Sequence, residues 1–156
     1  IQIDELTRPA RLDTATITAL TEPVARALAR LDRRRVRAAP GRWELVLDDP
    51  QDALTVMLEV LQRSRTAGLP GPSLGAHIAI STLLGDPAGD VLIPYGPGIP
   101  LARRLQAMAP PGLALISDAL AVTLVARGIT GLRSELYHRG DADSDGAVHV
   151  LLRAGQ

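Results

Sequence analysis

Residues 71–105, with the sequence GPSLGAHIAISTLLGDPAGDVLIPYGPGIPLARRL, decide the fold of this chain. The small and β-branched residues over 74–82 predict a buried strand. A loop rich in Gly, Pro and Asp follows, and Pro100 then opens a predicted helix over 101–108 that carries Arg104. A strand, a loop and an arginine-bearing helix are therefore the predicted centre of the fold.

The composition predicts one domain over residues 1–156. A chain of 156 residues with 46% hydrophobic residues can bury a core of its own. The 17 basic residues balance the 17 acidic ones, so we expect neither a nucleic-acid partner nor a membrane surface. Because the chain contains no Cys, a disulfide framework, a thiolate metal site and a Cys nucleophile are excluded.

The sequence also predicts where the protein works. It holds no apolar run of membrane-spanning length and no basic flank followed by an apolar stretch at its start, so we expect a cytoplasmic protein. All its basic residues are Arg, and Ala and Leu abound, which favours a bacterial source with a GC-rich genome. The first residue is not Met, so we expect a piece of a larger protein.

The first half of the chain predicts two helices among four strands. The apolar residues 1–3 and Leu6 predict a short strand that stops at Pro9 and carries Asp4 near its end. Asp13 or Thr14 could cap a helix that continues to residue 31. Pro23 either kinks this helix or lies in the first turn of a helix that restarts near residue 21. Strands over 32–36 and 42–47 form a predicted hairpin. A helix capped by Asp49 then runs to Gly68.

The second half adds a helix, a strand, a second helix and two strands. After the helix over 101–108, we expect a strand over 113–116 and a helix from Ser117 or Asp118 to about residue 127. Antiparallel strands over 132–138 and 148–152 complete the chain. The predicted fold class is α+β, with a ferredoxin-like βαββαβ core, both helices on one face of the sheet, and a C-terminal αβ extension.

The local sequences add a family to this order of elements. Five segments resemble the corresponding segments of class III nucleotidyl cyclase homology domains. They are the hairpin sequence around Pro40-Gly41 that leads into the helix at Asp49-Pro50, the strand sequence over 74–81, the Gly96-Pro97 step, the sequence Arg103-Arg104-Leu105 and the strand over 113–117. The resemblance covers almost the whole chain and implies the antiparallel cyclase sheet with helices.

The resemblance implies a degenerate site. The family uses two Asp residues to hold two divalent cations against a triphosphate; Asp4 falls at the first position, and Gly41 at the second supplies no carboxylate. Arg37 falls roughly at one base-reading position and Ile93 near the other. Pro100 replaces the Asn that orients the ribose, and Arg104 keeps the charge that would stabilise the transition state. Asp4, Arg37 and Arg104 are thus vestigial nucleotide or metal positions, and we expect no catalytic residue.

Other motifs favour structural roles. Residues 141–146 match the front half of a calcium loop, but Leu152 occupies the twelfth position, so we expect an acidic hairpin turn. The loop over 85–90 lacks the ending of a P-loop and predicts a solvent turn. His77, His138 and His149 lack the spacing of a zinc motif, and His77 is expected to be a core histidine with its hydrogen bonds satisfied. We expect neither a bound metal nor a cofactor.

The first hypothesis for function is therefore a catalytically inactive cyclase-like domain that serves as a dimerisation or protein-interaction module in a bacterial signalling protein. It predicts a homodimer, or a contact with another signalling domain, through the central strands and residues 96–105. The alternative is a nucleotide-binding or composite-site cyclase subunit that uses Asp4 and Arg104. A third reading is a ferredoxin-like ligand-binding domain, which a closed apolar pocket would favour.

Overall fold

The structure is a computed structural model of the 156-residue chain. It describes residues 2–4, 14–29, 31, 36–39, 42–80, 82–85, 92–138 and 146–153. The described residues form thirteen elements: β1 (Gln2–Asp4), α1 (Thr14–Leu28), β2 (Val36–Ala39), β3 (Arg42–Leu45), α2 (Pro50–Thr66), β4 (Ser73–Ala76), β5 (Thr82–Gly85), β6 (Leu92–Tyr95), α3 (Gly98–Met108), β7 (Ala114–Ser117), α4 (Asp118–Ala126), β8 (Leu132–His138) and β9 (Val148–Arg153).

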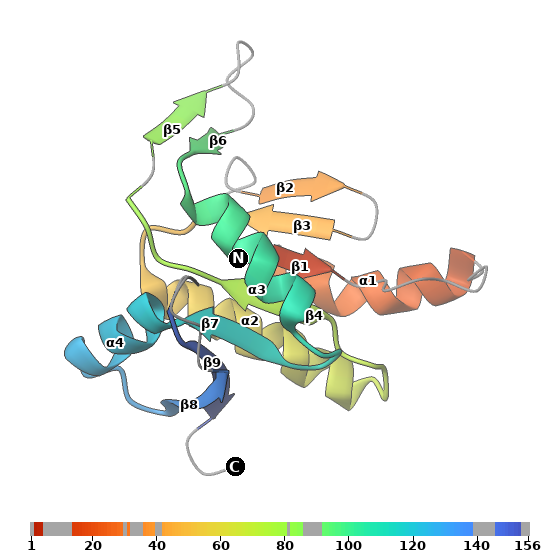
Figure 1. The fold of residues 1–156 in the computed structure, drawn as a ribbon. Coiled ribbons are helices and arrows are strands. Elements are labelled where there is room, and N and C mark those ends of the chain that lie inside the picture. The colour runs from red at the N-terminus through yellow and green to blue at the C-terminus, as the bar shows by residue number, and fades with distance from the viewer. Residues whose placement is uncertain are drawn as a thin grey trace.

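Seven of the strands form one mixed sheet in the order β2-β3-β1-β4-β7-β9-β8 (Figure 1). The first four strands are antiparallel neighbours, which is the sheet order of a ferredoxin-like core. β4 pairs in parallel with β7, and α3 lies in the connection between them. The predicted α+β class and its ferredoxin-like core are confirmed.

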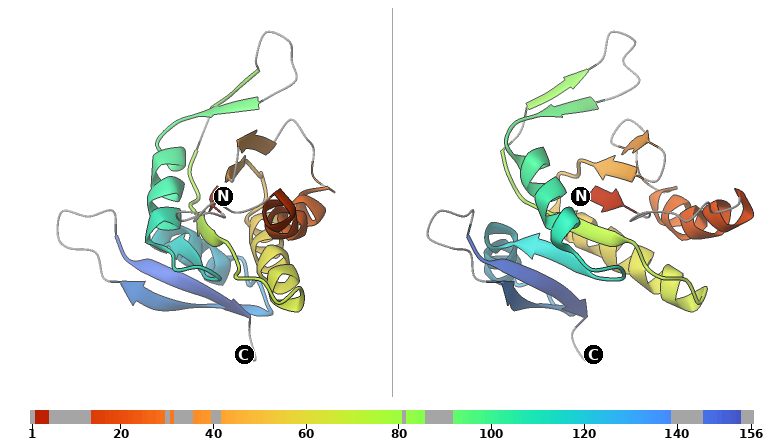
Figure 2. Two further views of the ribbon diagram at one scale, coloured as in Figure 1. Left: turned by 90° about the vertical axis from the view of Figure 1, so that its right-hand side faces the viewer. Right: turned by 45° about the vertical axis from the view of Figure 1, so that its right-hand side comes forward.

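Helices cover both faces of this sheet. α1 and α2 contact each other, α2 contacts α4, and together they lie on one face, while α3 packs on the other face against β4, β7 and β1 (Figure 2). The side chains of β7 alternate between the two faces of the sheet. Ala114 and Ile116 belong to the larger core cluster on the face of α2 and α4, whereas Leu115 packs with Leu105 of α3 on the other face. The sheet is therefore buried on both sides at its centre.

Gly75 in β4 fixes how closely α3 can approach the sheet. A Cβ added to this glycine would lie 2.3 Å from the backbone nitrogen of Gln106 and 2.4 Å from the carbonyl oxygen of Ala102. Both atoms belong to the backbone of α3, so no side-chain movement could make room. Only glycine allows this helix to lie directly on β4.

The strand predicted over 74–82 is wrong in extent. β4 ends at Ala76, and Thr82 begins β5, which pairs antiparallel with β6 in a separate two-stranded sheet. The Gly, Pro and Asp-rich stretch predicted as a loop thus contains most of a hairpin. A continuous apolar run favours a strand at every position. It does not reveal that its first part pairs in one sheet and its last part in another.

Two helices differ from the prediction at their prolines. α3 begins at Gly98, and Pro100 lies in its first turn, where a missing N–H leaves no intrahelical bond unmade. α1 is one helix over Thr14–Leu28 with Pro23 inside it, so the restart near residue 21 is not observed. α2 agrees with the prediction: Asp49 caps it and Pro50 opens it.

Some predicted features lie outside the described residues. These are the strand residues 32–35, residues 40–41 of the turn predicted over 37–41, most of the loop over 85–90 and the acidic turn over 141–145. The rest of the turn over 37–41 was predicted wrongly, because residues 37–39 belong to β2 and pair with β3. The two strands that flank the acidic turn, β8 and β9, pair antiparallel as predicted.

Candidate functional site

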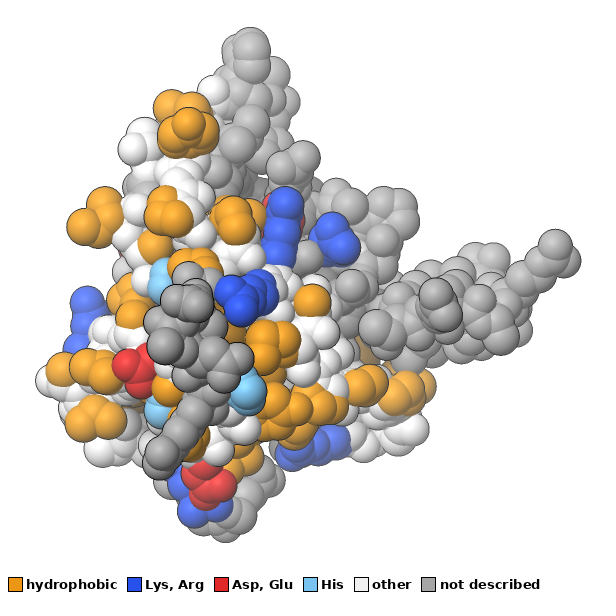
Figure 3. Space-filling view, viewed as in Figure 1, with side chains coloured by type: hydrophobic (Ala, Val, Ile, Leu, Met, Phe, Trp, Pro, Cys, Tyr) orange, Lys and Arg blue, Asp and Glu red, His pale blue; other side chains and the backbone are white. Residues whose placement is uncertain are grey.

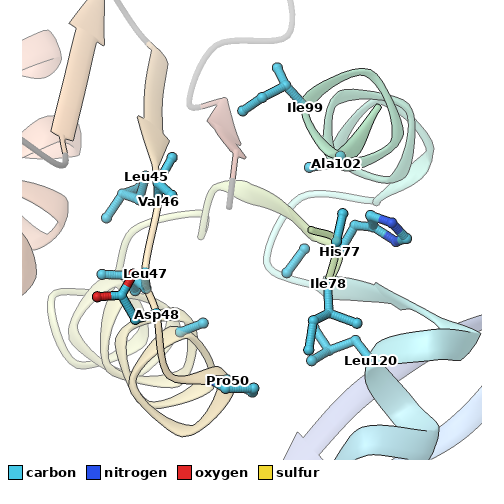
Figure 4. Close-up of a pocket in the computed structure, with 14 residues that line it drawn as sticks. Leu45, Val46, Leu47, Asp48, Pro50, His77, Ile78, Ile99, Ala102 and Leu120 are labelled. Atoms are coloured by element: carbon cyan, nitrogen blue, oxygen red, sulfur yellow. The ribbon is translucent and has the colours of Figure 1, made fainter. Parts of the chain in front are cut away.

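A cavity opens beside α3 at one end of the central strands. It measures about 300 Å³. Figure 4 shows it between the segment that joins β3 to α2, the end of β4, and the first turns of α3 and α4. Its lining consists of Leu45, Val46, Leu47, Asp48, Pro50, Ala53, Ala76, His77, Ile78, Ala79, Gly98, Ile99, Ala102 and Leu120.

The chemistry of this cavity suits an apolar group. Among the described lining residues there is no Arg or Lys, and the ionisable side chains are those of Asp48 and His77. His77 Nδ1 lies 2.9 Å from the hydroxyl oxygen of Ser117, which also caps α4 by accepting a hydrogen bond from the backbone of Leu120. His77 is therefore held by Ser117, but it is half-buried beside the cavity and lies beyond the end of β4, so the prediction of a core histidine is wrong. The described lining residues offer a triphosphate no cationic side chain to neutralise its charge.

Asp4 lies at the opposite end of β1 from this cavity. The register places Asp4 beside Arg42 and Ser73, whereas Gln2 lies beside Gly75, next to the cavity-lining Ala76. The side chain of Asp4 is not among those that the structure describes. On the backbone alone, Asp4 and the cavity belong to different ends of the sheet.

The sheet register also separates Arg37 from Asp4. Arg37 in β2 lies opposite Glu44 of β3, and Glu44 lies opposite Gln2 of β1. The residue in line with Asp4 is Ala39. Arg37 is thus aligned with the start of β1 rather than with the predicted metal position.

Arg104 lies on α3 with an exposed side chain, and it is not part of the cavity lining. α3 presents Ala102 to the sheet instead, where only 5% of that residue is exposed. The described residues contain no group of three or more His, Asp or Glu side chains that could hold a metal ion.

The structure reveals an ion pair that the sequence did not predict. Arg103 Nε donates to Glu44 Oε1 at 2.9 Å, which joins α3 to β3. The Glu44 side chain is 11% exposed and that of Arg103 is 47% exposed. The two residues lie 59 positions apart, so no local pattern could have indicated the contact.

An apolar surface on the β5–β6 hairpin is the second feature that the sequence missed. We call Ile80, Leu84 and Tyr95 the hairpin surface; they are 99%, 50% and 74% exposed. The hairpin projects away from the main sheet (Figure 1). Figure 3 shows separate hydrophobic side chains over the hairpin and around the adjoining first turn of α3.

Comparisons with known proteins match the architecture and not the sequence. Neither family models nor curated proteins match this sequence. The structure is similar to the dimeric guanylyl cyclase domain of the RhoGC fusion protein from the aquatic fungus Blastocladiella emersonii, with a TM-score of 0.73 and 12% identity over 97% of this chain and 94% of that one.

Two further solved structures give the same match. The guanylate cyclase domain from Catenaria anguillulae in complex with GTP matches with a TM-score of 0.67 and 15% identity over 97% of this chain and 94% of that chain. The adenylate/guanylate cyclase/hydrolase from Silicibacter pomeroyi matches with a TM-score of 0.65 and 19% identity over 96% and 92%. This chain has the class III nucleotidyl cyclase fold.

α3, the helix that the resemblance marks as the arginine-bearing one, packs on the face of the sheet opposite α1 and α2, and the projecting hairpin directly precedes it. No helix in the described part of the chain has the length and apolar character needed to cross a membrane.

Proposed function

We propose that this cyclase-fold chain is a catalytically inactive domain that serves as a dimerisation or protein-interaction module in a bacterial signalling protein of the cytoplasm. The hairpin surface is the observation that carries the proposal. It adjoins residues 96–105, the segment that the sequence favours as a contact.

Exposed apolar side chains are unfavourable in a domain that works alone. Burying a Leu, Ile or Tyr-sized side chain against a partner is worth roughly 1.5–3 kcal/mol. Ile80, Leu84 and Tyr95 together therefore offer enough apolar area to anchor a contact, and a projecting hairpin can reach across to a partner without disturbing the main sheet.

The residues at the catalytic positions support inactivity. Gly41 supplies no carboxylate, and Pro100 has neither the amide side chain nor the backbone N–H of the Asn that it replaces. Arg104 by itself would face a triphosphate without the metal ions that normally share its charge. Electrostatic stabilisation of a transition state needs a preorganised set of groups, and this set is incomplete.

The test combines calorimetry with light scattering on the purified chain. We expect no heat when a non-hydrolysable ATP or GTP analogue is added with manganese. We also expect that the variant Ile80→Ser/Tyr95→Ser has a lower average mass in solution than the wild type at the same concentration. Val125→Ser is the matched control, because Val125 is 80% exposed on α4 and lies outside the hairpin surface.

Two results would overturn the proposal. If the double variant has the same average mass as the wild type, the hairpin surface does not hold copies of the chain together. Micromolar binding of the analogue that disappears in Arg104→Ala would instead establish the alternative, a nucleotide-binding or composite-site subunit that uses Asp4 and Arg104.

A further inference from the structure

β8 forms one end of the seven-stranded sheet. In the described part of the chain it pairs on one side only, with β9. An edge strand of seven residues presents a row of backbone N–H and C=O groups to any extended segment that can lie beside it. The question is which segment would fit this edge.

The sequence of β8 is complementary to itself. Residues 132–136 have the sequence Leu-Arg-Ser-Glu-Leu. If a second copy lies antiparallel with Ser134 opposite Ser134, then Arg133 of each copy lies opposite Glu135 of the other, and each Leu132 lies opposite a Leu136. Opposite charges and apolar pairs in these positions stabilise a sheet.

The side chains of β8 are placed for this pairing. Arg133 and Glu135 lie on the same face, with Nη2 3.3 Å from Oε1 and with 48% and 55% of their side chains exposed. On the other face Leu132 packs against the core, and Leu136 is 49% exposed. A second copy would bring its Leu132 against the exposed Leu136 and would turn one ion pair into a ring of four alternating charges.

We propose that β8 is a self-association edge, which pairs antiparallel with β8 of a second copy about a two-fold axis at Ser134. The pairing joins two sheets into one continuous sheet. An isologous contact of this kind closes after two chains and leaves no further β8 edge exposed. The irregularity in the register between Leu136 and His138 marks the end of the paired segment.

This contact lies away from the hairpin surface. β8 and the β5–β6 hairpin are at opposite ends of the molecule (Figure 1). A dimer formed at β8 would therefore display two hairpin surfaces, so that a partner with two docking sites would bind it more tightly than it binds a single chain. The β8 proposal does not depend on the proposed function, because it uses different residues.

A single cysteine tests the geometry. The chain has no Cys, so Ser134→Cys introduces the protein's one thiol. Directly opposite residues in an antiparallel pair have Cα atoms about 4.5–5.5 Å apart, within the range of a disulfide. Under mild oxidation we expect Ser134→Cys to give a covalent dimer at least tenfold faster than Glu135→Cys, whose counterpart in the second copy would be Arg133. Equal rates would contradict the two-fold axis at Ser134.

Charge exchange tests the energetics in the Ile80→Ser/Tyr95→Ser background, where the hairpin surface no longer contributes. We expect Arg133→Glu and Glu135→Arg each to raise the dimer dissociation constant about tenfold, because like charges then lie opposite each other. The combined Arg133→Glu/Glu135→Arg variant restores opposite charges and should restore the dimer. Sedimentation measures all four proteins, and far-UV circular dichroism confirms that each is folded.

Two results would overturn the β8 contact: an Ile80→Ser/Tyr95→Ser protein that is monomeric, or a combined charge variant whose dimer dissociation constant is no lower than those of the single variants. Failure of the hairpin surface gives a different result: the Ile80→Ser/Tyr95→Ser substitutions would leave the wild-type mass unchanged, while the charge exchange would still control dimer formation. The two failures are therefore distinguishable.

Discussion

Arg103 of α3 donates from Nε to Glu44 Oε1 of β3 over 2.9 Å, and so connects the helix to a strand two places away from β4 in the sheet. α3 packs on β4 and β1, and this ion pair extends its attachment to the third strand. On the same helix Ala102 is buried against the sheet and Arg104 is exposed.

The Arg103 to Glu44 pair is expected to contribute measurably to stability. Because the carboxylate is largely buried, Arg103→Ala should lower the free energy of unfolding by about 1 kcal/mol. Urea titration followed by the fluorescence of Trp43, the chain's single Trp, measures the change. In a Glu44→Gln background the same substitution should cost much less. An equal cost in both backgrounds would show that the pair contributes nothing.

Gly75→Ala should be severely destabilising. The added methyl group would meet the backbone of α3 at 2.3 Å, so the helix must move away from β4, at a cost of roughly 3 kcal/mol or more. Gly85→Ala is the control, because a Cβ at Gly85 in β5 meets nothing within 4 Å. We expect its urea midpoint to match that of the wild type. Similar losses in the two variants would refute the close approach of α3.

Ser117 and Asp49 both cap helices, and their substitution by Ala should differ in cost. Asp49 Oδ1 accepts from the backbone N–H of Gln51 at 3.0 Å, and the loss of such a cap costs about 1 kcal/mol. Ser117 caps α4, is buried and also bonds His77 at 2.9 Å, so Ser117→Ala should cost about 1 kcal/mol more. Thermal unfolding of both variants checks the order. If Asp49→Ala is the more damaging change, the role of the His77 contact is smaller than we infer.

The hairpin surface should be separable from stability. Ile80 and Tyr95 are 99% and 74% exposed, so their replacement by Ser removes little buried area from the folded chain. We expect the double variant to unfold within about 0.5 kcal/mol of the wild type in urea. A loss of more than about 2 kcal/mol would mean that these side chains support the fold. A lower average mass of the double variant could then not be assigned to a lost contact.

Much of the fold was predictable because it depends on local chemistry. Asp49 and Pro50 define the start of α2, and the chain turns at Gly68, which has a φ of 68°. The order of elements gave the ferredoxin-like core. The prediction of one strand over 74–82 failed because neighbouring apolar residues look alike whether they share one partner strand or two.

The candidate site was less predictable. The resemblance selected Asp4, Arg37 and Arg104, but the register aligns Arg37 with Gln2 and places the backbone of Asp4 at the other end of β1 from the cavity. Arg104 is not among the described lining residues. The hairpin surface was missed because its segments were assigned to the end of a strand and to a loop. No spacing rule links Leu84 to Tyr95; they come together because β5 pairs with β6.

The sequence by itself determined the helix caps, the periodicity of the core and the absent carboxylate at Gly41, since each depends on residue type and on neighbours a few positions away. Only the tertiary structure decided which strands are edges, which residues lie beneath α3 and which side chains remain exposed. These properties depend on pairings between distant segments. Glu44 with Arg103 and β4 with β7 are such pairings, and their free energy appears only when the whole sheet is assembled.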